Sequence, residues 1–237
     1  MKDKKGHYHP LSQVMREMFL IFKDLGFEVA LGGEVETEEY NFDKLNIPAD
    51  HPARDMWDTF WLKPENSRKL LRTHTSPMQA RYMEENKPPL ALIVPGKVFR
   101  YEATDATHEA QFHQLEGLMI GKDVNLSNLK YILEVFFEKF LGEKMEIRFR
   151  PSYFPFVEPG IEVDMRPEGG KKWVEIMGAG MVHPKVLLNV GIDPREYQGF
   201  AFGMGIDRLA MLKFGIDDVR LFYTGDLRLV NQFPSKE

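Results

Sequence analysis

Apolar residues recur every three to four positions in several stretches of the chain, the spacing of a helix with one buried face. In residues 10–25 this stripe consists of Val14, Met18 and Phe22, and the run ends before a glycine. The other predicted helices cover residues 75–85, 127–141 and 207–214. The last two also stop at a glycine, which commonly ends a helix because it adopts the left-handed conformation without strain.

Between these helices lie short runs of the residue types and alternation that are typical of strands. The runs are residues 90–94, 97–103, 114–120, 145–150, 161–166, 172–177 and 199–203. Many follow one another with no helix between them, which favours an antiparallel sheet over a doubly wound parallel sheet. Residues 37–55 are polar and contain two prolines, so they indicate a long surface loop. The sequence therefore predicts one α+β domain over residues 1–237.

Composition narrows the function. The chain has 31 basic and 36 acidic residues, a net charge of −5, which argues against a general nucleic-acid coat. It contains no cysteine, which excludes disulfide scaffolds, thiol catalysis, thiolate zinc sites and iron–sulfur clusters. No apolar run approaches the ~20 residues of a membrane helix, and no secretory signal follows the charged start. We therefore expect a cytoplasmic protein without a membrane partner.

The common glycine-rich phosphate loops are absent from the sequence, so a bound nucleotide would be held in another way. His108 and His113 briefly suggest a zinc motif. Their spacing of five would place them about 140° apart on a helix, so they could not share a metal ion.

Polar residues concentrate on two of the predicted strands. Arg100 and Glu102 alternate on one, and Gln114 and Glu116 on the other, with a loop of about 8–10 residues between the strands. If the strands pair, one face carries a cation, an amide and two carboxylates. A solvated sheet face with a salt bridge is the alternative, but four such residues beside aromatic neighbours favour a site.

Residues 199–210 predict a strand, a glycine turn and a helix with Arg208 in its first turn. A cation there is at the positive end of the helix dipole, so an anion such as phosphate should compensate it. The alternative is an ion pair with Asp207 or Glu175.

Residues 150–159 place Phe154 and Phe156 on either side of a proline, with Glu158 close behind. This pattern suits a rigid, flat-walled pocket with an acidic rim. Core packing around a proline turn is the alternative.

Together these segments resemble the motifs of class II aminoacyl-tRNA synthetases, and in detail those of bacterial phenylalanyl-tRNA synthetase alpha subunits. Residues 97–120 resemble motif 2 and residues 199–214 motif 3, with motif 1 near residues 10–36. Signatures particular to this subunit are His-Thr-Ser-Pro at 74–77, Phe-Pro-Phe-Val-Glu-Pro at 154–159 and Gly-Ala-Gly-Met-Val-His-Pro at 178–184. The similarity runs from about residue 6 to residue 233.

The resemblance implies a class II catalytic fold, with an antiparallel sheet of about six strands flanked by helices. It also implies that L-phenylalanine and ATP give phenylalanyl-adenylate and pyrophosphate, and that the phenylalanyl group then passes to tRNA(Phe). Arg100 would hold the α-phosphate and Arg208 the γ-phosphate, with Glu102 also in the catalytic set. His108 and Phe112 would contact ATP. Mg²⁺ would bridge the phosphates, with Glu158 as a ligand.

The resemblance also implies an amino-acid pocket. Glu116 and Gln114 would balance the substrate ammonium, and Ala201 would lie near the para position of the ring. An apolar pocket of this kind rejects an added hydroxyl by only about 10²-fold, so tyrosine should not be excluded completely. The other residues implied for the pocket are Trp57, His74, Ser76, Gln79, Glu102, Phe154, Phe156 and Gly203.

The family's alpha subunit usually begins with a coiled-coil arm and pairs with a large beta subunit. This chain starts almost at the catalytic domain, so we expect tRNA binding to be weak without a partner. We expect a dimer through residues 10–25, with itself or a beta subunit, because Met15, Phe19 and Ile21 widen the apolar stripe. The alternative is a helix buried on both sides within one chain.

Two other functions stay open. One is a synthetase paralogue that adenylates another acid without tRNA, and the other is a regulatory module that binds an amino acid without catalysis. The retention of Arg100, Glu102 and Arg208 argues against the second.

Overall fold

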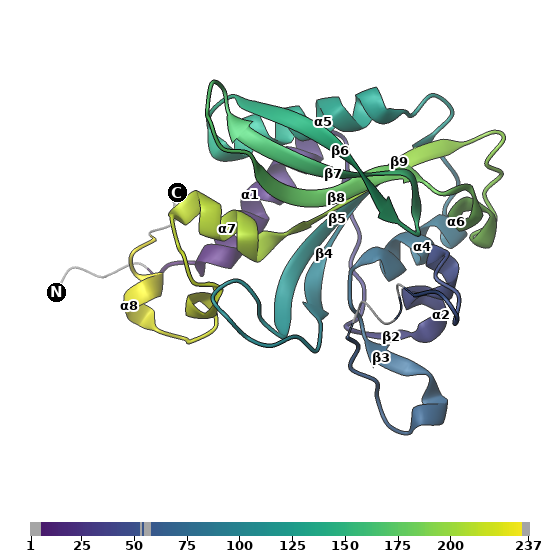
Figure 1. Cartoon of the computed structure of the whole chain (residues 1–237), viewed down its shortest axis with the longest axis horizontal. Coiled ribbons are helices and arrows are strands. Elements are labelled where there is room, and N and C mark those ends of the chain that lie inside the picture. The colour runs from purple at the N-terminus through teal and green to yellow at the C-terminus, as the bar shows by residue number, and fades with distance from the viewer. Residues whose placement is uncertain (1–5, 53, 55–57, 234–237) are drawn as a thin grey trace.

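A seven-stranded sheet in the order β1-β4-β5-β9-β8-β7-β6 forms the centre of the computed structural model, which describes residues 6–52, 54 and 58–233 (Figure 1). The strands β4 to β9 pair antiparallel, and β1 pairs parallel with β4 at one edge. The prediction of an antiparallel sheet of about six strands is therefore confirmed. Strand bounds are β1 (Glu28–Val29), β4 (Leu90–Phe99), β5 (Gln111–Gly121), β6 (Met145–Phe154), β7 (Val157–Pro167), β8 (Val174–Val182) and β9 (Gln198–Gly205).

Three helices cover one face of this sheet: α1 (Pro10–Asp24), α5 (Leu126–Leu141) and α7 (Ile206–Phe214) (Figure 1). α5 begins with a capping box at Asn125 and ends at Gly142, whose φ of 75° is left-handed. Phe22 of α1 stacks on Phe136 of α5 and Phe202 of β9, with ring centroids 4.7 and 5.6 Å apart. Helices α1, α5 and α7 thus cover this apolar face of the sheet, so a functional site is expected on the opposite face.

The other face of the sheet is partly covered by α2 (Glu38–Asn41), the 3-10 turn η1 (Asp43–Leu45), α4 (Ser76–Glu85) and α6 (Pro184–Asn189). The prediction that residues 37–55 form a surface loop is wrong for residues 37–47, whereas residues 48–52 are mostly exposed and form turns. Phe42, Leu45 and Ile47 are fully buried in this second core. Burial of these three apolar side chains places the segment against the core, although most residues around them are polar.

Smaller elements complete the described chain. β2 (Val35–Thr37) and β3 (Lys69–Leu71) form a separate two-stranded sheet, with the 3-10 turn η2 (Glu65–Ser67) before β3. The 3-10 turn η3 (Val219–Phe222) and α8 (Leu227–Val230) follow α7. Among the described helices, none has both the length and the apolar character needed to cross a bilayer.

Strand β4 differs from the prediction in a way that affects the site. Residues 90–99 form one strand, and β4 ends at Phe99, so Arg100 and Glu102 do not alternate on a strand face. Arg100 N instead donates to Ala110 O, and Glu102 N donates to Arg100 O. On β5 the alternation is as predicted, because Gln114 and Glu116 pair with Gly205 and Gly203 of β9.

Candidate active site

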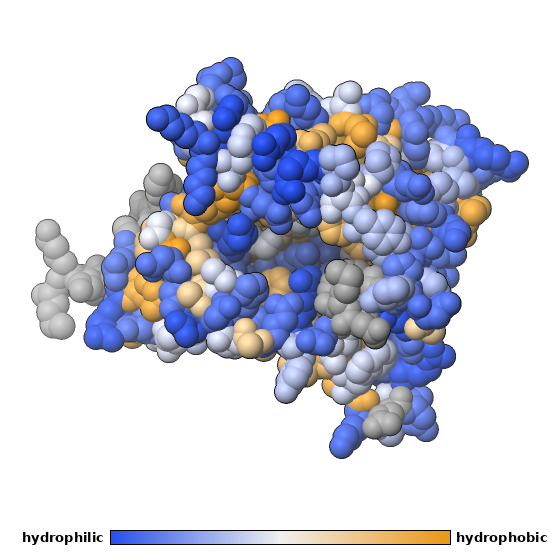
Figure 2. Space-filling view, in the orientation of Figure 1, coloured by the Kyte–Doolittle hydropathy of each residue, from blue (hydrophilic) through white to orange (hydrophobic). Residues whose placement is uncertain are grey.

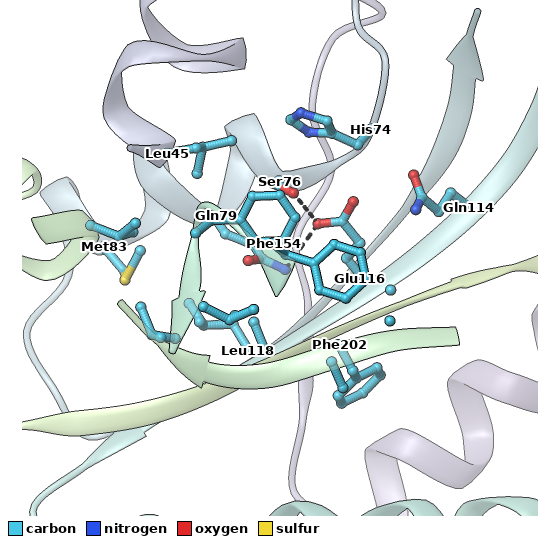
Figure 3. Close-up of a pocket in the computed structure, with 18 of the residues that line it drawn as sticks. Leu45, His74, Ser76, Gln79, Met83, Gln114, Glu116, Leu118, Phe154 and Phe202 are labelled. Carbon is cyan, nitrogen blue, oxygen red and sulfur yellow. Dashed lines mark hydrogen bonds between the residues drawn. The ribbon is translucent and has the colours of Figure 1, made fainter. Parts of the chain in front are cut away.

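Two adjoining cavities open on the face of the molecule that Figure 2 shows hollowed at its centre. The first has a volume of about 250 Å³ and lies between α4, β5, β9 and the β6–β7 turn (Figure 3). The second, of about 570 Å³, lies beside α7 and the loop between β4 and β5. Arg100 lines both cavities, so it marks their junction.

Most of the predicted site residues line one of these cavities. The first is lined by the predicted residues His74, Ser76, Gln79, Gln114, Glu116, Phe154, Phe156, Ala201 and Gly203. The second is lined by Glu102, His108, Phe112 and Arg208. Trp57 lies outside the described residues. Glu102 lines the second cavity and not the first, so the structure does not bring it to the expected amino-acid pocket.

Glu116 is the buried acid of the first cavity. Its carboxylate accepts a hydrogen bond from Thr75 N at 3.0 Å. It also accepts from Ser76 Oγ and from Gln79 Nε2 at 3.4 Å, as Figure 3 shows. Burial raises the pKa of Glu116 because it disfavours the charged form, although these donors and two nearby arginines oppose the shift. The site therefore suits a ligand with a positive charge, which would stabilise the ionised carboxylate.

Gln114 offers a second acceptor next to Glu116. Its buried Oε1 has no hydrogen-bond partner in the described part of the chain, so it is available to a ligand. Gly203 makes the space for both side chains. A Cβ there would lie 3.2 Å from Glu116 Cγ and 3.3 Å from Gln114 Nε2.

Aromatic rings form the apolar wall of the same cavity. Phe154 ends β6 and Phe156 lies in the β6–β7 turn, with ring centroids 6.0 Å apart and planes at 21°. Phe154 lies against Gly178, where a Cβ would meet its ring at 2.9 Å. Both rings line the cavity, as the pocket interpretation predicts, and Phe156 also packs against the second core.

His74 lies on the polar side of this cavity and is buried, with its ring 6.5 Å from that of Phe156. Burial and the charge of Arg100 lower the pKa of His74 to about 3. Its imidazole is therefore neutral at physiological pH and can orient a ligand without repelling an ammonium group.

Arg100 is held in place by a backbone carbonyl and an aromatic ring, and the charges of Glu102 and Glu116 only partly offset its burial. Its Nε donates to Thr73 O at 3.2 Å, and its guanidinium lies 5.2 Å from the Phe112 ring centroid. Within the described residues no carboxylate lies at ion-pair distance, and burial lowers its pKa. Because arginine keeps its proton in proteins, an incompletely solvated cation stands at the junction of the two cavities. An anion is its natural ligand.

Arg208 is the second cation, in the first turn of α7. Its Nη2 donates to the backbone carbonyl of Glu175 at 2.9 Å. The alternative of an ion pair is wrong. The Glu175 carboxylate binds Arg150 at 2.9 Å, and buried Asp207 accepts from His113 N at 2.7 Å and from a tyrosine hydroxyl. The Arg208 guanidinium thus remains exposed toward the second cavity.

Comparisons with known proteins agree with this site. The profile of the tRNA synthetases class II core domain (F) family matches residues 1–233. The phenylalanine–tRNA ligase alpha subunit of Dehalococcoides mccartyi is 54% identical over 242 aligned residues, covering 96% of this chain and 70% of the relative. The alpha subunit of Enterococcus faecalis is 53% identical, covering 98% and 70%. The chain belongs to the phenylalanine–tRNA ligase alpha subunit family. The predicted resemblance is confirmed.

Solved structures support the fold of this alpha-subunit family member. A pyrrolysyl-tRNA synthetase from Desulfitobacterium hafniense aligns with a TM-score of 0.69 at 21% identity, covering 91% of this chain and 74% of that chain. A second structure, the PylSc protein of the same organism, gives 0.68 at 19% identity, covering 89% and 71%. At these identities the similarity shows the fold alone.

The sequence analysis did not predict a charged cluster on β6, β7 and β8 of this alpha-subunit family member, which is joined to Arg208 through the backbone carbonyl of Glu175. Arg150 of β6 binds Asp164 and Glu162 of β7 and Glu175 of β8, with nitrogen–oxygen distances of 2.7 to 2.9 Å. The signal was present in the alternation of arginines on β6 opposite acids on β7. It could be recognised only once the strand register was known.

Glu158 lies apart from this cluster. Its carboxylate is 72% exposed and pairs with His183 Nε2 at 3.1 Å. Glu175 pairs with Asp164, six residues further along β7 than Glu158, which corresponds to about 20 Å of strand. The structure therefore does not bring Glu158 to the Arg208 end of the site, and any metal bound by it would lie at that separate surface.

Proposed function

We propose that this chain activates L-phenylalanine with ATP and, together with a beta subunit, transfers the phenylalanyl group to tRNA(Phe). The observation that carries the proposal is the position of Arg100 between an amino-acid-sized cavity and a larger cavity that ends at Arg208. The reaction joins two anions, the amino-acid carboxylate and the α-phosphate, and a cation at that junction serves both. One continuous sheet carries both cavities, which supports a single catalytic domain.

In the first cavity the ammonium group of phenylalanine would bind the Glu116 carboxylate and Gln114 Oε1. Its ring would lie against Phe154 and Phe156, and Ala201 would limit the space beyond the ring. The volume of about 250 Å³ is at the low end of ligand cavities, as a single amino acid requires.

In the second cavity Arg100 would bind the α-phosphate and Arg208 the γ-phosphate, while Phe112 and His108 contact the nucleoside. The substrate carboxylate oxygen then attacks the α-phosphorus, and the bond to pyrophosphate breaks. The two products of this step are phenylalanyl-adenylate and pyrophosphate. Catalysis arises from positioning and from preorganised charge, so no enzyme nucleophile is required.

Class II synthetases use ATP with Mg²⁺, which would neutralise phosphate charge here. A Mg²⁺ site commonly takes one or two carboxylates and completes its shell with phosphates and water. Glu175 would supply one such carboxylate, because its backbone carbonyl accepts from Arg208 and its side chain is exposed, although the carboxylate also binds Arg150 at 2.9 Å. We therefore assign this role to Glu175, and not to Glu158.

The partner surface would include the outer side of α1 and the segment after it. Leu20, Val29, Leu31 and Val35 are exposed there. Of the residues on which the dimer prediction was based, Ile21 is buried in the chain's own core, and Met15 and Phe19 are partly buried against that core. The exposed apolar residues now support a beta-subunit contact.

The test is amino-acid-dependent ATP–pyrophosphate exchange, measured with all amino acids, with and without a beta subunit. Exchange with phenylalanine is expected. Exchange with a different amino acid would support the paralogue instead. ATP binding without exchange in the presence of the beta subunit would support the regulatory module.

Arg208→Ala should reduce exchange by about 10²-fold, because charge-assisted hydrogen bonds to phosphate contribute ~1.5–3 kcal/mol each. The loss should fall on the ATP dependence and leave the KM for phenylalanine near its parent value, since Arg208 lines only the second cavity. Saturation kinetics in each substrate measure this, and near-normal use of ATP by the variant would rule out the role.

A further inference from the structure

We propose that Asn46 is a specificity-determining residue that fixes the width of the phenylalanine pocket, an inference that rests on the proposed function. Asn46 lies directly after η1, in the segment between α2 and β3. Its Nδ2 donates a hydrogen bond of 2.6 Å to the carbonyl oxygen of Pro155, which is 109 residues away in the sequence. It does not itself line either cavity.

The acceptor is at the tip of the aromatic wall. Pro155 and Phe156 form the turn between β6 and β7, so the rings of Phe154 and Phe156 flank the bonded carbonyl. The next carbonyl, that of Phe156, accepts from His183 N at 2.9 Å. Two successive carbonyls therefore hold the turn. The Asn46 side chain binds the carbonyl of Pro155, and the backbone N–H of His183 binds the carbonyl of Phe156.

The donor, Asn46, belongs to a segment that lines the pocket opposite the aromatic wall. Leu45, the residue before Asn46, lines the same cavity as Phe154, and both side chains project into it (Figure 3). Phe42 and Ile47 on either side are buried and anchor this segment to the second core. Asn46 thus joins this anchored segment directly to the turn. His51 Nε2 also lies 3.0 Å from Tyr153 Oη of β6, but the Asn46 hydrogen bond is the one made to the turn that carries the aromatic wall, so it helps to set the separation of Leu45 from that wall.

The backbone at Asn46 suits asparagine. Its φ of 62° and ψ of 35° are left-handed, a conformation that asparagine tolerates better than most residues with a side chain. Asn46 N also donates to Asp43 O at 3.2 Å and closes the η1 turn. Glycine would accept the same backbone but donate nothing to Pro155, and aspartate would keep the shape but lack the donor.

The test compares Asn46→Gly and Asn46→Asp with the parent, in complex with the beta subunit, by ATP–pyrophosphate exchange. Loss of one hydrogen bond should raise the KM for phenylalanine about three- to tenfold. The KM for ATP and the kcat should stay near the parent values. Relative exchange with tyrosine and with para-substituted phenylalanines should increase, because the wall is free to move outward.

Asn189→Ala is the matched control. Asn189 Nδ2 donates to the carbonyls of Asp43 and Lys44, so it holds the same η1 turn but does not touch the aromatic wall. Parent-like selectivity is expected for Asn189→Ala. An equal change of selectivity in the Asn46 variants and in Asn189→Ala would overturn the proposal. Parent-like selectivity in the folded Asn46 variants would overturn it as well. Thermal unfolding identifies the folded variants. A parent complex that shows no exchange with phenylalanine would instead overturn the proposed function.

Discussion

Replacement of Arg100 by glutamine is expected to lower kcat/KM for phenylalanine-dependent ATP–pyrophosphate exchange by about 10³-fold, the scale seen when a charge that stabilises a transition state is removed. Arg100 lines both cavities and has no carboxylate at ion-pair distance in the described part of the chain. It is therefore free to bind the α-phosphate as negative charge develops there. The loss should fall mainly on kcat, since this contact strengthens in the transition state.

Two further variants sharpen this prediction. Arg100→Lys keeps a positive charge but loses the planar donor fork, so its activity should lie between those of the parent and Arg100→Gln. Arg195→Gln is the control, because Arg195 is 89% exposed, pairs with Asp193 and lines neither cavity. Activity of Arg100→Gln within tenfold of the parent would contradict the assignment, provided that circular dichroism shows the folded state.

The importance of Arg100 could be predicted from the sequence, but its geometry could not. Alternation predicted a strand over residues 97–103 with Arg100 and Glu102 on one face, whereas β4 ends at Phe99, the residue before Arg100, and the chain turns. Local periodicity does not show where a strand stops pairing, because the end depends on the partner strand. The same reasoning succeeded for Gln114 and Glu116, which lie in the middle of β5.

Contacts between residues that are distant in the sequence also could not be predicted. The cluster of Arg150 with Asp164 and Glu175 depends on the register of three strands, and Asn46 reaches Pro155 from the opposite side of the pocket. Neither relation leaves a periodic signal within one segment. The family resemblance identified most lining residues of the pocket, but not the residues that hold its walls apart.

Glu116→Gln is expected to raise the KM for phenylalanine by about 10²-fold or more, because removal of one partner of a buried ion pair costs about 3–5 kcal/mol. The Glu116 carboxylate is 5% exposed, and burial raises its pKa. In the free enzyme it therefore gains a proton at a higher pH than an ordinary glutamate. The parent KM for phenylalanine should fall as pH rises through this pKa, and the variant should not show that step.

The same substitution should not lower the free energy of unfolding, although it weakens substrate binding. A carboxyl group whose pKa is raised on folding contributes stability that is present below its unfolded pKa and is lost as pH rises through its folded pKa. Glutamine carries no charge at any pH, and its amide can still accept from Thr75 N and donate to Ser76 Oγ. At neutral pH Glu116→Gln should therefore have a free energy of unfolding equal to or above that of the parent, measured by urea denaturation.

Glu36→Gln separates burial from binding. Glu36 is also buried, at 6% exposed, but it pairs with Arg81 at 2.8 and 3.0 Å and lines neither cavity. Its neutralisation should lower the free energy of unfolding and leave the KM for phenylalanine unchanged. A Glu116→Gln enzyme with a parent-like KM, or a KM increase of the same size in Glu36→Gln, would show that Glu116 does not bind the substrate ammonium. The opposite pattern, with binding lost at Glu116 and stability lost at Glu36, would show that this buried carboxylate is kept for the ligand at the expense of the fold.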